Sequence, residues 1–123
     1  MKKICFLILI LSVSALSVSA QLENTKWKNI LYIPDAVECI FDFKKDTVFI
    51  KVAQDGSIVE TMTYKISHDS LILTKVSGLS PCSDETGIYK FEFKEEKLYI
   101  TPINDGCSDR SNAFQSSAWI KEG

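Results

Sequence analysis

The only histidine in the chain, His68, is the first candidate for catalysis. It stands in residues 67–70, whose sequence Ser-His-Asp-Ser holds every side-chain type of a hydrolytic triad. In a triad the histidine lies between the nucleophile and the carboxylate in space, and four consecutive residues in a tight turn cannot converge in that way. We therefore predict that His68 is an exposed turn residue.

The acidic residues form no clear catalytic pair. Glycoside hydrolysis requires two carboxyl groups that flank a cleft, whereas most acids here fall in expected turns or outward-facing positions. Glu60 is the exception, because it shares a face of its expected strand with Ile58 and Met62. A buried unpaired carboxylate is costly, so Glu60 lies near a rim, has a partner, or is displaced by a β-bulge. We predict that the protein is not an enzyme.

The cysteines favour a structural disulfide over a metal or redox site. No CxxC, HExxH or Cys/His cluster occurs in the sequence, so we expect neither a metal nor a cofactor. Cys39 shares a strand face with Phe41, which is typical of a buried small hydrophobic residue. Cys82 and Cys107 fall in two polar loops. Cys5 lies in the expected export signal described below, and of the three possible pairings among the other cysteines we predict Cys82–Cys107, with Cys39 free.

The first residues have the layout of an export signal. A pair of lysines follows Met1, an almost unbroken apolar run covers residues 4–11, and the small residues Val-Ser-Ala occupy positions 18–20. The apolar run is too short for a transmembrane helix, which needs about 20 apolar residues. The pattern predicts a signal peptide over residues 1–20, followed by an exported domain, periplasmic or extracellular, over residues 21–123.

The composition of the expected domain limits its partners. The whole chain has 123 residues, with 14 basic and 16 acidic side chains, and removal of the two N-terminal lysines leaves 12 against 16. Nucleic acids and anionic membranes are bound mainly through Lys and Arg. We therefore expect a single domain, a monomer, that binds neither nucleic acid nor, once the signal is removed, a membrane.

Almost every segment of the domain alternates between apolar and polar residues, and turn residues recur every 8–12 positions. This rhythm is typical of an all-β sandwich or barrel. Eight short strands joined mostly by tight turns can close on themselves, which removes exposed edges. We predict an eight-stranded antiparallel up-and-down barrel. The expected strands are 26–33, 37–43, 47–53, 57–66, 70–76, 87–94, 97–103 and 113–121.

Two stretches resemble a known family. Residues 24–28, Asn-Thr-Lys-Trp-Lys, resemble the first strand of lipocalin-like, or calycin, barrels, where a tryptophan often stands in a Gly-X-Trp motif; Thr25 replaces that glycine. Residues 105–110, Asp-Gly-Cys-Ser-Asp-Arg, with Trp119 nine residues later, are similar to exported lipocalin-like domains of bacteria. The resemblance implies that Arg110 packs over Trp27 and closes the barrel. The alternative is a solvated Arg110 paired with a nearby aspartate.

Inward-facing aromatic residues leave two functions open. They can line a pocket, or they can fill a small barrel that needs its core. Our leading prediction is a non-enzymatic lipocalin-like domain that binds a small apolar or amphipathic ligand in the barrel. The alternative is a protease inhibitor or protein-interaction module, and an interior cavity of a few hundred cubic ångströms would favour the ligand. The candidate ligand-binding residues are Phe41, Met62, Tyr64, Tyr89 and Phe91.

Overall fold

The computed structural model describes residues 21–33, 35–83, 85–114 and 118–123. The predicted signal peptide therefore lies outside the described residues. The elements are β1 (Lys26–Tyr32), β2 (Ala36–Phe43), β3 (Thr47–Val52), β4 (Ile58–Ser67), β5 (Ser70–Gly78), β6 (Thr86–Lys94), β7 (Lys97–Asn104), α2 (Ser108–Ala113) and β8 (Trp119–Glu122).

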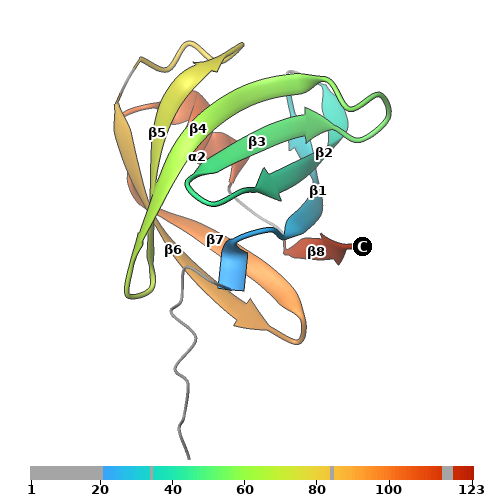
Figure 1. Ribbon diagram of the computed structural model, residues 1–123. Helices are drawn as coiled ribbons and strands as arrows, with labels where there is room; N and C mark the ends of the chain where they lie inside the picture. The colour runs from blue at the N-terminus through green and yellow to red at the C-terminus, as the bar shows by residue number, and fades with distance from the viewer. Residues whose placement is uncertain (1–20, 34, 84, 115–117) are drawn as a thin grey trace, which may run out of the picture.

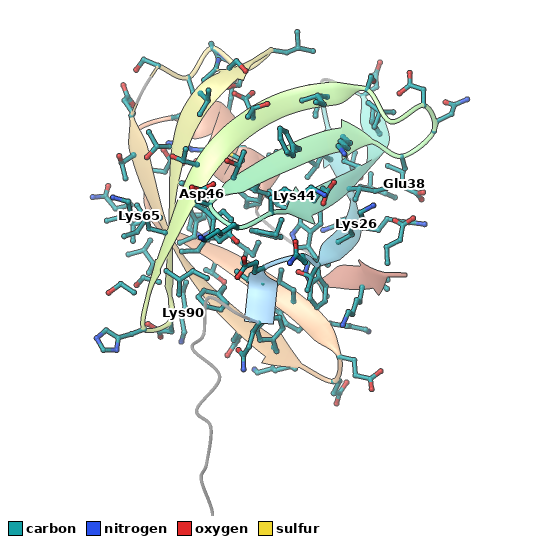
Figure 2. All side chains as sticks on the ribbon, viewed as in Figure 1. Lys26, Glu38, Lys44, Asp46, Lys65 and Lys90 are labelled. Carbon is teal, nitrogen blue, oxygen red and sulfur yellow. A yellow bond between two sulfur atoms is a disulfide. The ribbon has the colours of Figure 1, made fainter. Side chains whose placement is uncertain are left out.

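The eight strands form a closed barrel in which each strand pairs antiparallel with its neighbours in the sequence (Figure 1). Strand β8 pairs with β7 on one side and with β1 on the other, which closes the sheet. The predicted up-and-down barrel is thus confirmed. The alternation of apolar and polar residues explains why these segments form strands with one buried face. In β6, Tyr89 and Phe91 are buried while Lys90 is exposed. Lys65 and Lys90 extend from the outer surface into solvent (Figure 2).

Aromatic rings fill the middle of the barrel. Phe41 lies at its centre, with ring centroids 4.4 Å from Trp119 and 5.1 Å from Phe114. Phe43 packs edge-on against Tyr64, whose hydroxyl donates to a backbone carbonyl of the turn after β2. Burial and nearby acidic groups raise the pKa of Tyr64 to about 12. Each buried ring stabilises the fold by about 1.5–3 kcal/mol.

Cys39 is free and buried, as predicted. Its burial in this apolar core raises the pKa of its thiol. Because the thiolate is the reactive form of cysteine, the residue acts here as a small hydrophobic side chain. His68 lies exposed in the turn between β4 and β5, with a φ of 57°, and the prediction of a turn residue is confirmed.

The C-terminal segment differs from the prediction of one long strand over residues 113–121. Residues Ser108–Ala113 form the short helix α2, and β8 begins only at Trp119. Six residues make less than two helical turns, so no hydrophobic period of 3.6 residues can show in the sequence. The helix matters because it lies across one end of the barrel and carries Arg110.

The predicted contact between Trp27 and Arg110 is wrong. Trp27 lies where β1 begins and packs on Phe93, at 5.7 Å between centroids, while its indole N–H donates to Thr25. Arg110 lies at the opposite end, where β7 ends and α2 begins. There it pairs with Asp105, five residues earlier in the chain. A buried guanidinium is paired far more strongly by a carboxylate than by an aromatic face.

Two register shifts bend the sheet around Glu60. Between β3 and β4 the pairing moves from Ile50–Glu60 to Lys51–Ile58, and between β4 and β5 it moves from Thr61–Ser77 to Met62–Lys75. The first shift turns Ile58 outward, where 54% of it is exposed. The expectation that Ile58 shares the inward face of Glu60 is therefore wrong, because a bulge changes which face a residue occupies.

Candidate binding cavity

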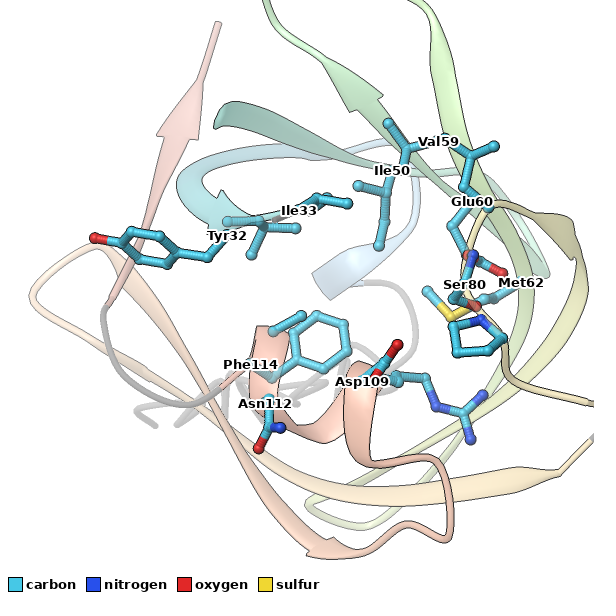
Figure 3. A pocket seen from close by; sticks show the side chains of 15 residues that line it. Tyr32, Ile33, Ile50, Val59, Glu60, Met62, Ser80, Asp109, Asn112 and Phe114 are labelled. Atoms are coloured by element: carbon cyan, nitrogen blue, oxygen red, sulfur yellow. The ribbon is translucent and has the colours of Figure 1, made fainter. Parts of the chain in front are cut away.

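A cavity of about 490 Å³ opens at the end of the barrel that α2 crosses. Its wall is formed by the end of β1, the middle of β3, the first half of β4, the loop after β5, and α2. Figure 3 shows Ile33 and Ile50 on one side, Asn112 of α2 and the following Phe114 on another, and Glu60, Met62 and Ser80 grouped together. Most of the lining is apolar, with charge concentrated at a few side chains.

Asp105 anchors the helix side of this cavity. Its fully buried carboxylate accepts hydrogen bonds from Nε of Arg110 at 2.6 Å, from Nη2 of Arg110 at 2.7 Å, and from the amide of Cys107 at 2.9 Å. The Tyr89 hydroxyl donates to the same carboxylate. Burial alone would raise the pKa of Asp105, but the bonds from Arg110, Tyr89 and Cys107 outweigh it and hold the pKa below its usual range. The carboxylate is ionised and fully satisfied.

Gly87 makes room for this anchor. A Cβ atom at Gly87 would clash with an Asp105 carboxylate oxygen, so a side chain at this position would displace the carboxylate. Arg110 also donates from Nη2 to the carbonyl of Glu85 at 2.9 Å, which ties α2 to the start of β6. The pKa of Arg110 is raised, chiefly by its hydrogen bonds to Asp105. The guanidinium is thus fixed in place and permanently charged.

A disulfide joins the two loops that frame the mouth. Cys82 and Cys107 are bonded, as predicted, with their Cα atoms 5.4 Å apart. Cys82 follows the cavity residues Ser80 and Pro81, and Cys107 is the N-cap of α2. The bond therefore holds the loop beside Glu60 close to the helix that carries Arg110.

Glu60 combines the three interpretations that its sequence position allowed. It lies at the cavity rim, it stands between two register shifts, and its carboxylate is 3.6 Å from Nζ of Lys75. Its Oε2 accepts a hydrogen bond of 3.1 Å from the Ser80 amide. Gly78 has a φ of 142°, and a Cβ there would lie 2.7 Å from Cδ of Glu60, so only glycine lets the carboxylate take this position.

Buried polar atoms without partners gather at this cavity. Among the residues described, four buried side-chain atoms have no hydrogen-bond partner, and three of them belong to cavity residues: Oε1 of Glu60, Oγ of Ser80 and Nη1 of Arg110. Native proteins leave few such atoms, and each calls for an explanation. They are one acceptor, one donor and one hydroxyl that can do both. Because all three atoms are buried, a ligand in the cavity can pair with them only when their side chains turn toward it.

The structure separates the predicted ligand-binding residues. Met62 lies in the cavity wall, whereas Phe41, Tyr64, Tyr89 and Phe91 belong to the packed core. The predicted aromatic residues are thus part of the packed core. Mostly aliphatic side chains and the helix α2, which the sequence did not predict, surround the cavity. The sequence signal that points to the mouth is a set of apolar residues at strand ends and in the loops that follow them. These are Tyr32, Ile33 and Leu79, which are 74%, 38% and 78% exposed at the mouth.

The described part of the chain contains no group of three or more His, Cys, Asp or Glu side chains placed to hold a metal ion. Within those same residues, no helix is long and apolar enough to cross a membrane. Compared with models of protein families, with curated proteins and with solved structures, the chain matches none.

Proposed function

We propose that this protein is an exported, lipocalin-like barrel that binds a small amphipathic molecule in the cavity at its α2 end. The observation that carries the proposal is the coincidence of an apolar cavity of about 490 Å³ with three lining residues that each have a buried polar atom without a hydrogen bond. Ligand cavities commonly measure about 300–1,000 Å³ and place a few polar groups in an apolar wall. A ligand that pairs these atoms removes a desolvation cost of about 1–3 kcal/mol each.

The shape of the mouth supports binding of a molecule with an apolar part. Tyr32 and Leu79 are among the most exposed large apolar residues described, and both belong to the cavity lining. Exposed apolar side chains beside a cavity provide a surface on which an alkyl chain can first be captured. Their position at the mouth, rather than scattered over the barrel, favours this use.

Export and the lipocalin-like relationship belong to the same proposal. The disulfide between Cys82 and Cys107 supports an oxidising compartment, since such bonds are rare in the cytosol. The signal-like pattern of the first twenty residues agrees with that compartment. The closed up-and-down order of eight strands is the architecture that lipocalins use to hold one small ligand.

A neutral fluorescent probe tests the proposal. N-phenyl-1-naphthylamine is dark in water and bright in apolar surroundings, so we expect a saturable fluorescence increase at one probe per chain. Ile50→Trp adds a ring inside the cavity and should weaken probe binding at least tenfold. Ile58→Trp is the matched control, because Ile58 pairs beside Ile50 but faces solvent.

Both variants are first checked for a cooperative urea transition. If Ile50→Trp does not fold, Ala113→Phe introduces a ring from the helix side of the same cavity. Absence of saturable binding, or equal weakening by Ile58→Trp, contradicts the proposal. Such a result would favour the alternative of a module that binds a protein partner through its exposed Tyr32 and Leu79.

A further inference from the structure

The positive charges around the cavity already have partners. Nε and Nη2 of Arg110 donate hydrogen bonds to the Asp105 carboxylate at 2.6 and 2.7 Å, so a single carboxylate balances the charge of Arg110. Lys75 lies 3.6 Å from Glu60 and donates to the Ser80 carbonyl. A third carboxylate, Asp109, also lines the cavity and is exposed. No further cation stands in the described lining, so the excess charge at the mouth is negative.

This balance disfavours a ligand with an anionic head. A carboxylate brought to Nη1 of Arg110 would add a charge beside a cation that Asp105 already neutralises. It would also approach Glu60 and Asp109, which line the same cavity. Like charges close together in a partly apolar site repel each other, and an unbalanced buried charge loses much of its hydration.

The hydrogen-bonding pattern describes the head that fits. Nη1 of Arg110 can only donate, Oε1 of Glu60 can only accept, and Oγ of Ser80 can do either. A carboxylate head can only accept, and an ammonium head can only donate. A hydroxyl or a primary amide does both without adding charge.

We infer that the cavity selects an uncharged amphipathic molecule whose polar head both donates and accepts hydrogen bonds, of the class of alkyl amides and alcohols, in preference to the corresponding carboxylate. This inference rests on the proposed function, since it concerns the same cavity. It adds a division of labour in which Arg110 holds the acceptor atom of the head, Glu60 holds the donor, and the aliphatic wall takes the chain.

Four ligands with the same ten-carbon chain test the selectivity. Decanamide, decan-1-ol, decanoate and decylamine compete at pH 7.5 with the bound N-phenyl-1-naphthylamine. We expect decanamide and decan-1-ol to displace the probe at concentrations at least about tenfold lower than decanoate, the factor that one hydrogen bond to a charged group contributes. Decylamine, which is cationic at this pH, should fall between the uncharged ligands and decanoate.

Any apolar cavity disfavours a charged head. The decisive result is therefore how a variant changes the preference for decanamide over decanoate. Glu60→Gln keeps the side-chain shape but removes one negative charge and leaves Lys75 without its carboxylate. The preference for decanamide over decanoate should then fall by about tenfold or more. Asp109→Asn should lower it in the same direction but less, because Asp109 is exposed. Glu92→Gln is the control, since Glu92 lies on the outer surface near Lys94.

The outcomes separate this inference from the function on which it rests. If the probe does not bind at all, the proposed function fails. If the probe binds but decanoate displaces it as well as decanamide does, or if Glu60→Gln leaves the preference unchanged, only the inference fails. Tighter binding of decylamine than of decanamide also overturns it, because the head would then be held by the carboxylates alone.

Discussion

Two buried carboxylates at the same end of the barrel have opposite surroundings. Asp105 receives hydrogen bonds from Nε and Nη2 on one edge of the Arg110 guanidinium, from the Tyr89 hydroxyl and from the Cys107 amide. Glu60 receives one amide hydrogen bond, from Ser80, and its second oxygen faces a lysine at 3.6 Å without a hydrogen bond. One carboxylate is saturated, and the other retains capacity for a partner.

The difference indicates which polar group builds the fold and which is available to a ligand. A carboxylate with every lone pair used stabilises the structure and contributes nothing to binding. A buried carboxylate with an oxygen that lacks a hydrogen bond weakens the fold slightly, and it becomes stabilising only when a ligand donates a hydrogen bond to that oxygen. The barrel therefore uses Asp105 to fix α2, and α2 in turn holds Arg110 against the cavity.

The largest expected effect comes from Asp105→Asn. The change leaves the Arg110 charge buried without its partner, so the free energy of unfolding should fall by about 3–5 kcal/mol. Urea unfolding of the two proteins measures this. A loss below about 1 kcal/mol would show that the saturated network is not what holds the helix, and the contrast with Glu60 would disappear.

Removal of the disulfide ranks next. The bond closes a loop with a sequence separation of 25 residues, and its loss through Cys82→Ser with Cys107→Ser should cost about 3 kcal/mol. Probe binding should weaken as well, because the Ser80 loop and α2 are no longer joined. Thiol labelling of residues 21–123 without these substitutions should detect one thiol, Cys39, and only after unfolding. Unchanged probe affinity in the double variant would mean that the bond does not shape the cavity.

Acid should weaken the protein through its saturated carboxylates. The pKa of Asp105 lies below its usual range, so the unfolded chain takes up a proton more readily than the folded one. The stability that Asp105 contributes is therefore fully present above the unfolded pKa, about 4, and is lost as the pH falls through the folded value. Asp42, paired with Lys51 and Lys44, acts in the same direction. Unfolding measured from pH 6 to pH 2 should show a shallower loss in Asp105→Asn than in the parent. Equal slopes would argue against the network.

The smallest effect on stability should come from Glu60→Gln. The change keeps an acceptor for the Ser80 amide, and Lys75, which loses a carboxylate at 3.6 Å without a hydrogen bond, keeps its hydrogen bond to the Ser80 carbonyl. Urea unfolding should therefore move by less than about 1 kcal/mol, although ligand selectivity changes strongly. A loss as large as that of Asp105→Asn would make Glu60 a structural residue and remove the distinction on which the binding proposal depends.

The sequence predicted the barrel because its signal is local. Alternation in segments such as β6 needs only neighbouring residues, and the loop positions of Cys82 and Cys107 were sufficient for the disulfide. The helix α2 was missed because six residues carry no detectable period. The bulges around Glu60 were missed in detail because register depends on both neighbouring strands.

The cavity was harder to predict than the fold for a related reason. An empty space results from what the surrounding elements do not fill, and no residue type marks it. Phe41 and Tyr89 were reasonable candidates for a wall, but Phe114, which follows α2, packs against both of them, and they belong to the core. Ile33 and Leu79 line the mouth because loops place them there, and loop placement follows from tertiary contacts.

The most direct test is a pair of crystal structures, one grown without ligand and one with decanamide. We predict that the amide lies in the cavity with its carbonyl oxygen within hydrogen-bonding distance of Nη1 of Arg110 and its NH₂ group within hydrogen-bonding distance of Oε1 of Glu60. The alkyl chain should lie against Ile50 and Phe114. Decanamide bound elsewhere, or ordered waters that satisfy the three polar atoms and persist in the presence of the amide, would contradict the account.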